Sequence, residues 1–217
     1  MTADLSQMRE PSREEMHAAL EKRQGAEAVR KLQAATVAVC GLGGLGSNIA
    51  ISLARAGVGK LILIDFDSVD VTNLHRQQYK ACQVGRPKPE ALLANLKEIA
   101  PYTEYEAHFE KVIAENAKAL LCKADVICEA FDNAEAKAML VNTVLENMPE
   151  KFLVAASGMA GYDSGNSITT RKVTKRFFVC GDGQSDVNDG IGLIAPRVML
   201  CAAHQALIAI RLILGLE

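Results

Sequence analysis

The stretch Thr36-Val-Ala-Val-Cys40, followed directly by Gly41-Leu-Gly43-Gly44-Leu-Gly46, decides the fold. A short apolar run that ends in glycines predicts a buried strand. Residues 47–56 carry helical periodicity up to Gly57. Strand, G-x-G-x-x-G and helix in this order form a nucleotide-binding fingerprint, because glycines let the backbone approach phosphates at a helix N-terminus. The alternative for this stretch alone is a tight turn without a ligand.

The chain beyond this stretch alternates strands and helices. Apolar runs predict strands at 60–65, 125–130 and 152–156, and alternation predicts a more exposed strand at 103–110. Helices are expected between them at 89–99, 114–123 and 134–147. This alternation predicts an α/β fold with a parallel sheet wrapped by helices. Hydrophobic residues make up 49% of the chain, aromatic residues only 5%, and Trp is absent. The core must therefore be aliphatic, as in buried parallel sheets.

The two ends of the chain differ from this pattern. Residues 1–12 are polar and predict a flexible N-terminus. Ser12-x-x-Glu15 is a capping box that opens a helical stretch to Leu32. We expect residues 13–217 to form a single domain, because a segment of this length suits one large domain better than two small ones.

The C-terminal third loses the strand–helix alternation. Residues 166–171 and 175–180 resemble a hairpin of antiparallel strands, and 181–190 reads as a flexible loop or crossover. A closing helix is expected at 196–214. We therefore predict antiparallel strands added to the parallel sheet in this third.

Charge and hydropathy favour some classes of protein over others. The net charge of −2 gives no reason to expect nucleic acid or a membrane surface as partner. No uninterrupted apolar run reaches the roughly 18 residues of a membrane span. The nearest candidate, 195–214, contains Arg197, His204, Gln205 and Arg211. The charged N-terminus does not resemble a secretory signal, so we expect a cytoplasmic protein.

The six cysteines form no C-x-x-C pair. Most lie in apolar runs, where a free cysteine behaves as a small apolar side chain, and we expect about five of them to do so. Neither a zinc knuckle nor a disulfide framework is indicated.

Polar residues follow the second predicted strand in an unusual string, Asp65-Phe-Asp67 through Asn73-Leu-His-Arg76-Gln77. Asp65 lies about twenty residues after the glycines, where an acid binds the ribose hydroxyls. An NAD-dependent dehydrogenase has no need for the three polar side chains beyond it. A triphosphate site needs such side chains. Arg76 can donate two parallel hydrogen bonds to phosphate oxygens, and the side-chain amides of Asn73 and Gln77 can donate others.

Two further residues extend this site. Lys88 lies just before a helix and can supply a second cation, while Asp132 follows a later strand at the sheet edge where ligands bind. A single carboxylate there suits Mg²⁺, which keeps several waters. Each has an alternative: Arg86 and Lys88 as solvated surface charges, and Asp132-Asn133 as a helix N-cap.

The chain resembles the ThiF/MoeB/HesA family, bacterial relatives of ubiquitin-activating E1 enzymes, from about Arg23 to Gly215. The resemblance is carried by the glycine stretch to Ser47, Ala56-Gly-Val-Gly59, the Asp65–Gln77 string, Gly85-Arg-Pro-Lys88 and Asp132-Asn133. It implies a Rossmann-like E1-type fold, with Gly41 and Gly43 in a nucleotide cradle and Asp65 on the ribose. It also implies that Asn73, Arg76, Gln77 and Lys88 face the phosphates, with Asp132 near Mg²⁺. A homodimer is implied too, in which Arg23 reaches the ATP of the other subunit.

The chain departs from this family at its cysteines. Members commonly carry two C-x-x-C pairs that hold zinc, but here the first is replaced around Cys180 and the second is missing. The short, zinc-free proteins of thiamin biosynthesis are the better match, so we expect no zinc. Some relatives also use a crossover-loop cysteine for a covalent link to their substrate. That position falls near Asn188, and Cys180 is more simply a core residue.

The resemblance implies an enzyme with ATP and Mg²⁺ as cofactors. It would adenylate the C-terminal glycine carboxylate of a ubiquitin-like sulfur-carrier protein of the ThiS type, ending in Gly-Gly, and release pyrophosphate. Arg76, Lys88 and Asp132 are the candidate catalytic residues. The rivals are an NAD-dependent oxidoreductase, a relative that activates a carbonyl on tRNA, and a non-catalytic nucleotide-binding regulatory module.

Overall fold

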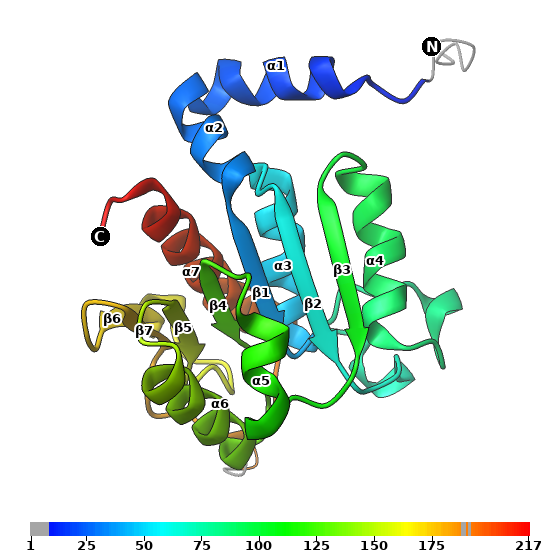
Figure 1. Ribbon diagram of the computed structural model, residues 1–217. Helices are drawn as coiled ribbons and strands as arrows, with labels where there is room; N and C mark the ends of the chain where they lie inside the picture. The colour runs from blue at the N-terminus through cyan, green and yellow to red at the C-terminus, as the bar shows by residue number, and fades with distance from the viewer. Residues whose placement is uncertain (1–8, 188–189, 191) are drawn as a thin grey trace.

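The computed structural model describes residues 9–187, 190 and 192–217, which form a seven-stranded sheet in the order β3-β2-β1-β4-β5-β7-β6 (Figure 1). Neighbouring strands are parallel except β6, which runs antiparallel to β7. The strands are β1 (Thr36–Cys40), β2 (Lys60–Asp65), β3 (Glu104–Phe109), β4 (Val126–Glu129), β5 (Phe152–Ala156), β6 (Thr169–Lys172) and β7 (Phe177–Gly181). The predicted α/β fold with antiparallel strands in the C-terminal third is confirmed.

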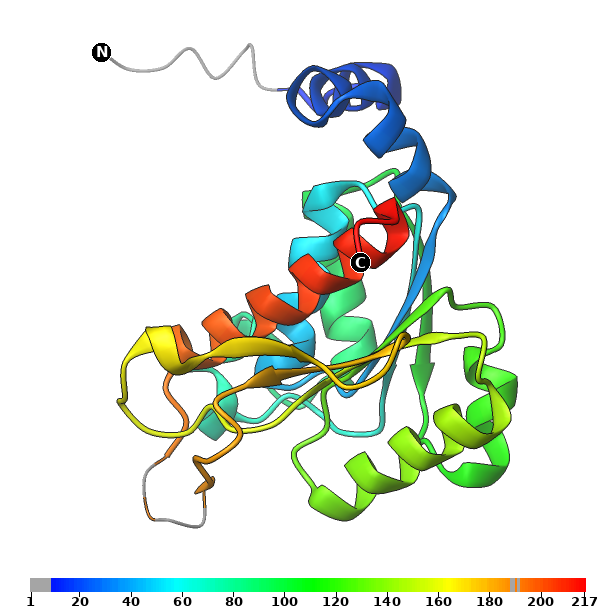
Figure 2. The same cartoon turned by 90° about the vertical axis from the view of Figure 1, so that its left-hand side faces the viewer.

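Helices cover both faces of the sheet. The described helices are α1 (Arg13–Gln24), α2 (Ala26–Ala34), α3 (Gly44–Ala56), α4 (Lys88–Ile99), α5 (Ala114–Leu121), α6 (Ala134–Asn147) and α7 (Ala195–Leu214). α3, α4 and α7 pack on one face, while α5 and α6 pack on the other (Figures 1 and 2). The order of the strands reverses between β1 and β4, and ligands bind at such a point outside the carboxyl ends of the strands.

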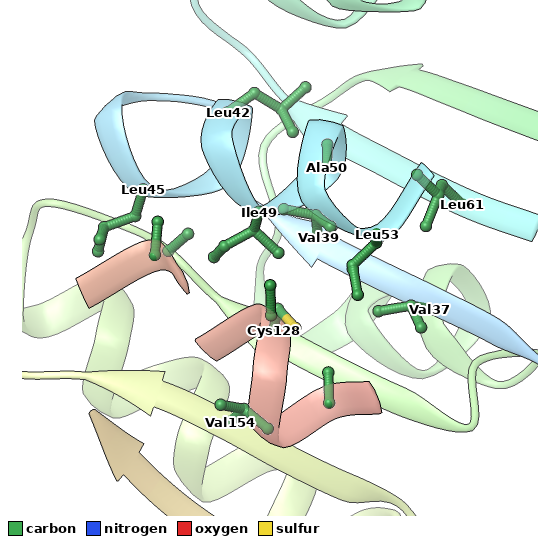
Figure 3. Close-up of a cluster of buried hydrophobic side chains, with 14 of the residues drawn as sticks. Val37, Val39, Leu42, Leu45, Ile49, Ala50, Leu53, Leu61, Cys128 and Val154 are labelled. Carbon is green, nitrogen blue, oxygen red and sulfur yellow. The ribbon is translucent and has the colours of Figure 1, made fainter. Parts of the chain in front are cut away.

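Two apolar cores result from the alternation of side chains along each strand. Val37 and Val39 of β1 point to the α3 and α7 side, whereas Ala38 and Cys40 point to the α5 and α6 side. Figure 3 shows the first core, where Ile49 and its neighbours on α3 meet side chains of β1, β4 and β5. Both cores are mainly aliphatic, as the composition predicts.

α7 is the longest described helix and packs along α3 on one face of the sheet (Figure 2). In the described part of the chain, it alone is long and apolar enough to cross a membrane by length and composition. Half of its most apolar window is buried inside the molecule, and Arg197 and Gln205 are buried with it. Core helices pass the same test, so this is weak evidence for a membrane span.

The N-terminal helical stretch is divided, not continuous as expected. The capping box at Ser12 and Glu15 is present, but Gly25, at φ +87°, ends α1 and precedes α2. α1 has no buried residue and projects from the body of the molecule (Figure 2). Of the N-terminus predicted to be flexible, residues 1–8 lie outside the described residues. Residues 9–12 make contacts: Arg9 pairs with Glu15, and Pro11 accepts a hydrogen bond from Tyr102.

The cysteines are slightly more exposed than expected. Cys82 and Cys122 are exposed, and the other four are buried. Cys180 belongs to the first core, as its apolar surroundings in the sequence predict. Among the described residues, no group of three or more His, Cys, Asp or Glu side chains could hold a metal ion.

The glycine turn between β1 and α3 depends on two glycines. Gly41 has φ +87°, and a Cβ added to it would lie 2.7 Å from the carbonyl oxygen of Ala130. A Cβ on Gly46 would lie 1.8 Å from the carbonyl oxygen of Gly41. Both neighbours are backbone atoms and cannot rotate away. The turn therefore admits only glycine at these two positions.

Replacing Gly46 tests this close approach. Gly46→Ala should lower the free energy of unfolding by about 3 kcal/mol or more, because the backbone must move to admit the methyl group. For a chain of this length that corresponds to a fall in Tm of roughly 6–12 °C. Gly192→Ala is the matched control, since no atom lies within 4 Å of its added Cβ. Thermal unfolding of both variants makes the comparison, and equal Tm values would contradict the steric explanation.

Candidate functional site

A cavity of about 600 Å³ opens at the carboxyl edge of the sheet. The elements around it are the turn after β1, the ends of β2, β4 and β5, and the segment from 66 to 88. All ten residues chosen from the sequence line this cavity: Gly41, Gly43, Gly44, Asp65, Asp67, Asn73, Arg76, Gln77, Lys88 and Asp132. The fold thus brings together residues that lie up to 91 positions apart (132 − 41 = 91).

Two carboxylates and a lysine form one side of the cavity. Asp65 is buried at the end of β2 and accepts the N–H groups of Leu42 at 2.6 Å and Asp67 at 2.7 Å. Lys88 Nζ lies 2.8 Å from Asp67 Oδ2 and 3.9 Å from Asp65 Oδ2. Burial raises the pKa of the Asp65 carboxyl, and the Lys88 charge opposes that rise. This side can offer carboxylate oxygens to ribose hydroxyls.

The position of Lys88 decides between the two interpretations of the Gly85–Lys88 sequence. Arg86 is exposed, as a surface charge would be. Lys88 is only 5% exposed and lines the cavity. Its ammonium is paired with Asp67, so Lys88 lies near the carboxylates as well as facing the cavity. Lys88 is therefore not a solvated surface charge.

Arg76 and Gln77 present polar atoms with no partner in the described structure. Arg76 Nη2 donates to Asn73 Oδ1 at 3.0 Å, but its Nε is buried without a hydrogen bond. Gln77 is 7% exposed, and its Oε1 is also buried without a partner. Burial lowers the pKa of the Arg76 guanidinium, and the charge of Asp132 opposes the effect. Buried polar atoms without partners are costly, so a bound polar group is the simplest reason to keep them here.

Side-chain hydrogen bonds fix the Arg76 segment to α3. Ser47 Oγ donates to the carbonyl of Gly43 at 2.6 Å and accepts the N–H of Gln78 at 3.1 Å. Asn48 Nδ2 donates to the carbonyl of Gly44 at 2.6 Å and to that of Arg76 at 3.3 Å. The guanidinium is thereby held beside the N-terminus of α3, where free N–H groups favour anions.

Asp132 follows β4 and lines the same cavity as Arg76. Its carboxylate is exposed, and its charge acts on the Arg76 guanidinium. The helix cap is supplied by Asn133, whose Oδ1 accepts the N–H of Ala136 at 2.9 Å. Asp132 is therefore not needed as the cap of α6.

The cavity has a second group of walls that sequence reasoning missed. Phe66, Glu110, Val112 and Phe131 lie on the side of β2 and β4, whereas 156–160, 185–187 and Lys137 lie toward β5. The first group follows strand ends, as Asp65 and Asp132 do, and that position could have identified it. Residues 156–160 also lie at a strand end, that of β5, and the packing of β5 beside β4 brings them to the site.

Three other groups of residues considered in the sequence analysis are not found at this cavity. No cysteine is among the described residues that line it. Asn188 lies outside the described residues. Arg23 is exposed on α1, which connects through α2 to the amino end of β1, at the opposite edge of the sheet. Arg23 therefore does not reach the cavity of its own chain.

The fold is similar to that of solved structures. The E. coli tRNA N6-threonylcarbamoyladenosine dehydratase TcdA, crystallised in complex with ATP, matches with a TM-score of 0.84 at 21% identity. The match covers 92% of this chain and 94% of that chain. At this identity the likeness shows a shared fold.

Curated relatives are more similar in sequence. An adenylyltransferase and sulfurtransferase MOCS3 from Anopheles gambiae is 32% identical over 206 residues, covering 89% of this chain and 44% of that protein. An adenylyltransferase and sulfurtransferase uba4 from Aspergillus niger is 36% identical over 136 residues, covering 62% of this chain and 28% of that protein. This chain thus spans less than half the length of these two relatives.

A family-level comparison covers nearly all of the globular chain. The sequence model of the ThiF family matches residues 16–217. That range includes the glycine turn, the Asp65–Gln77 string, Lys88 and Asp132. The chain belongs to the ThiF family.

Proposed function

We propose that this chain is a nucleotidyltransferase that binds ATP in the cavity and transfers AMP to the C-terminal glycine carboxylate of a ubiquitin-like sulfur-carrier protein. The observation that carries the proposal is the unpartnered buried Nε of Arg76, beside the N-terminus of α3. A phosphate group would satisfy the arginine there. The names of the curated relatives, which include adenylyltransferase activity, support the same reaction.

In this proposal the nucleotide lies in the cavity in one direction. Asp65 and Asp67 offer acceptors for the ribose, while the glycine turn, Asn73 and Arg76 offer donors for the phosphates. Lys88 lies beside the two carboxylates and retains donor capacity beyond its pair with Asp67. An NAD-dependent oxidoreductase would use the ribose end but would give Arg76 and Gln77 no role.

Asp132 is the residue that fits a magnesium ion. It is one exposed carboxylate without a surrounding cluster of acids in the described residues. Mg²⁺ binds through one or two carboxylates together with phosphate oxygens and waters, so one protein ligand is enough. When bound, Mg²⁺ would neutralise charge on the triphosphate.

The chemistry requires little of the protein beyond position and charge. A peptide α-carboxyl has a pKa of about 3.5, so the carrier carboxylate is anionic at neutral pH and needs no general base. One carboxylate oxygen bonds to the α-phosphorus, and the bond from that phosphorus to the bridging oxygen breaks to release pyrophosphate. Arg76 and Lys88 would reduce the repulsion between the two anions and hold them in line.

The absence of a lining cysteine among the described residues favours adenylyl transfer over sulfur transfer at this cavity. We further propose a ThiS-type carrier, the thiamin pathway and a cytoplasmic location. Support for these comes from the family resemblance, and pyrophosphate exchange with a panel of Gly-Gly-ending carriers distinguishes the candidates. Activity with a modified tRNA and none of the carriers would favour the tRNA-modifying rival instead.

Replacing Asp132 tests the metal end of the site. Asp132→Ala should abolish carrier-dependent ATP–pyrophosphate exchange or strongly reduce its rate. The expected loss of transition-state stabilisation is about 2–4 kcal/mol, by analogy with deletions of an oxyanion-hole donor. The fold should remain, because Asn133 and not Asp132 caps α6. Circular dichroism and Tm check the fold. Normal exchange in a folded Asp132→Ala chain would refute the assignment.

Replacing Arg76 tests the phosphate end. Arg76→Lys should lower kcat/KM for ATP by about 10- to 100-fold, because lysine keeps the charge but lacks the Nε–H and the planar fork. Arg86→Ala is the matched control, since Arg86 is exposed and does not line the cavity, and it should change kcat/KM by less than about twofold. If both variants behave alike, charge near the site is sufficient and the fork has no specific role.

We also propose a homodimer in which Arg23 contacts the ATP bound in the cavity of the other subunit. The reason is that α1 has no buried residue in the single chain. Arg23→Ala and Asp132→Ala should each be inactive alone. Mixed and reassociated, they should recover about one quarter of the exchange activity, since random pairing gives half heterodimers with one complete site each. No recovery despite demonstrated subunit exchange would exclude a role for Arg23 across the dimer.

A further inference from the structure

Glu129 is a fully buried carboxylate at the end of β4, and the proposed reaction does not use it. Its Oε1 accepts the N–H of Phe131 at 2.7 Å. Burial raises the pKa of the Glu129 carboxyl, and the charge of Lys137 opposes that rise. The residue lies three positions before Asp132 in the turn that carries it.

Lys137 is the partner of this carboxylate. It lies on α6, lines the cavity, and donates to Glu129 Oε1 at 3.0 Å and Oε2 at 3.1 Å. It also donates to the carbonyl oxygen of Ala156 at 3.2 Å. An ammonium group has three N–H donors, so these acceptors can use all of them. Lys137 thus joins the end of β4 to the end of β5 at the cavity wall.

The turn between Glu129 and Asp132 is held on two sides. On one side, Glu129 accepts a hydrogen bond from the N–H of Phe131. On the other, the Phe131 ring and the Ala130 carbonyl lie against Gly41. Asp132 is the next residue and is itself exposed. Its position therefore depends on the turn, and the turn depends on the carboxylate of Glu129.

The stability of the folded chain does not by itself explain the buried Glu129–Lys137 ion pair. Removing two charges from water is costly, and well-packed apolar side chains of similar volume often stabilise a protein as well or better. A buried pair at the edge of a ligand cavity, with hydrogen bonds to the backbone on both sides, is instead typical of a site that needs fixed geometry.

We propose that Glu129 and Lys137 are positioning residues that hold the Asp132 turn in place for the divalent cation of the bound nucleotide. This inference rests on the proposed function, because it takes ATP as the ligand and Asp132 as the metal-binding residue. The pair itself touches neither nucleotide nor metal in this assignment. It acts through the N–H of Phe131 and the carbonyl of Ala156.

The test uses the full chain with both charges removed together. In Glu129→Gln/Lys137→Met, no unpaired charge remains buried, and both replacements keep similar volume. Isothermal titration calorimetry measures the Kd of ATP with and without Mg²⁺. We expect the gain in affinity from Mg²⁺ to fall by about tenfold or more, as for the loss of other groups that orient a metal ligand. The metal-free Kd should stay within about twofold, because Arg76 and the glycine turn are unchanged.

Two single variants separate position from general stability. Lys137→Arg keeps a cation for Glu129 and should recover most of the gain from Mg²⁺. Lys60→Met is the matched control: it removes a lysine that pairs with Glu104 and Glu106 at the opposite edge of the sheet, and it should leave the gain unchanged. The same gain in the double variant as in the parent overturns the inference. So does an equal weakening of metal-free and Mg²⁺-bound ATP, or a Lys137→Arg chain as defective as the double variant.

Failure of the proposed function would give a different result. A parent chain that does not bind ATP contradicts the nucleotide assignment itself. A parent that binds ATP equally well with and without Mg²⁺ contradicts the metal role of Asp132. When the parent shows a clear gain from Mg²⁺, the three overturning outcomes given above count against the positioning role of Glu129 and Lys137 and not against the proposed function.

Discussion

The backbone of Gly46 lies against the carbonyl group of Gly41, and the carboxyl edge of the sheet depends on this contact. It lets α3 start close to the end of β1, so that the helix N-terminus opens into the cavity. The same turn supports β4, because Gly41 lies against the carbonyl of Ala130. A side chain at either glycine would push α3 away from the strands, and the donors at its N-terminus would move with it.

The remaining parts of the site are attached to this turn by hydrogen bonds. Ser47 and Asn48, in the first turns of α3, hold the segment that carries Arg76. Asp65 accepts the N–H of Leu42 and so fixes the end of β2 to the same loop. Glu129 holds the opposite turn through the N–H of Phe131. The cavity is therefore rigid on three sides, and its polar groups are oriented before a ligand arrives, which is the condition for electrostatic stabilisation of a transition state.

Each cationic side chain of the site lies near a carboxylate. Lys88 pairs with Asp67, Lys137 pairs with Glu129, and the charge of Asp132 acts on Arg76. Two of these contacts are ion pairs within hydrogen-bonding distance, whereas Arg76 Nε makes no hydrogen bond in the described structure. The Arg76 guanidinium therefore keeps a free N–H donor, while the ammonium groups of Lys88 and Lys137 are paired.

The sequence by itself determined the α/β fold, the glycine turn and ten of the residues that line the cavity. Each of these ten residues follows a strand end or belongs to a local motif. It also predicted the antiparallel strands, although β6 and β7 begin two or three residues later than expected. Local patterns could not show the break at Gly25, since the helical residues continue on both sides of it. Nor could they show that Lys88 is buried with Asp67, or that Lys137 joins Glu129 to Ala156. Those contacts join residues from different strands and helices, so only the packing of the whole sheet decides them.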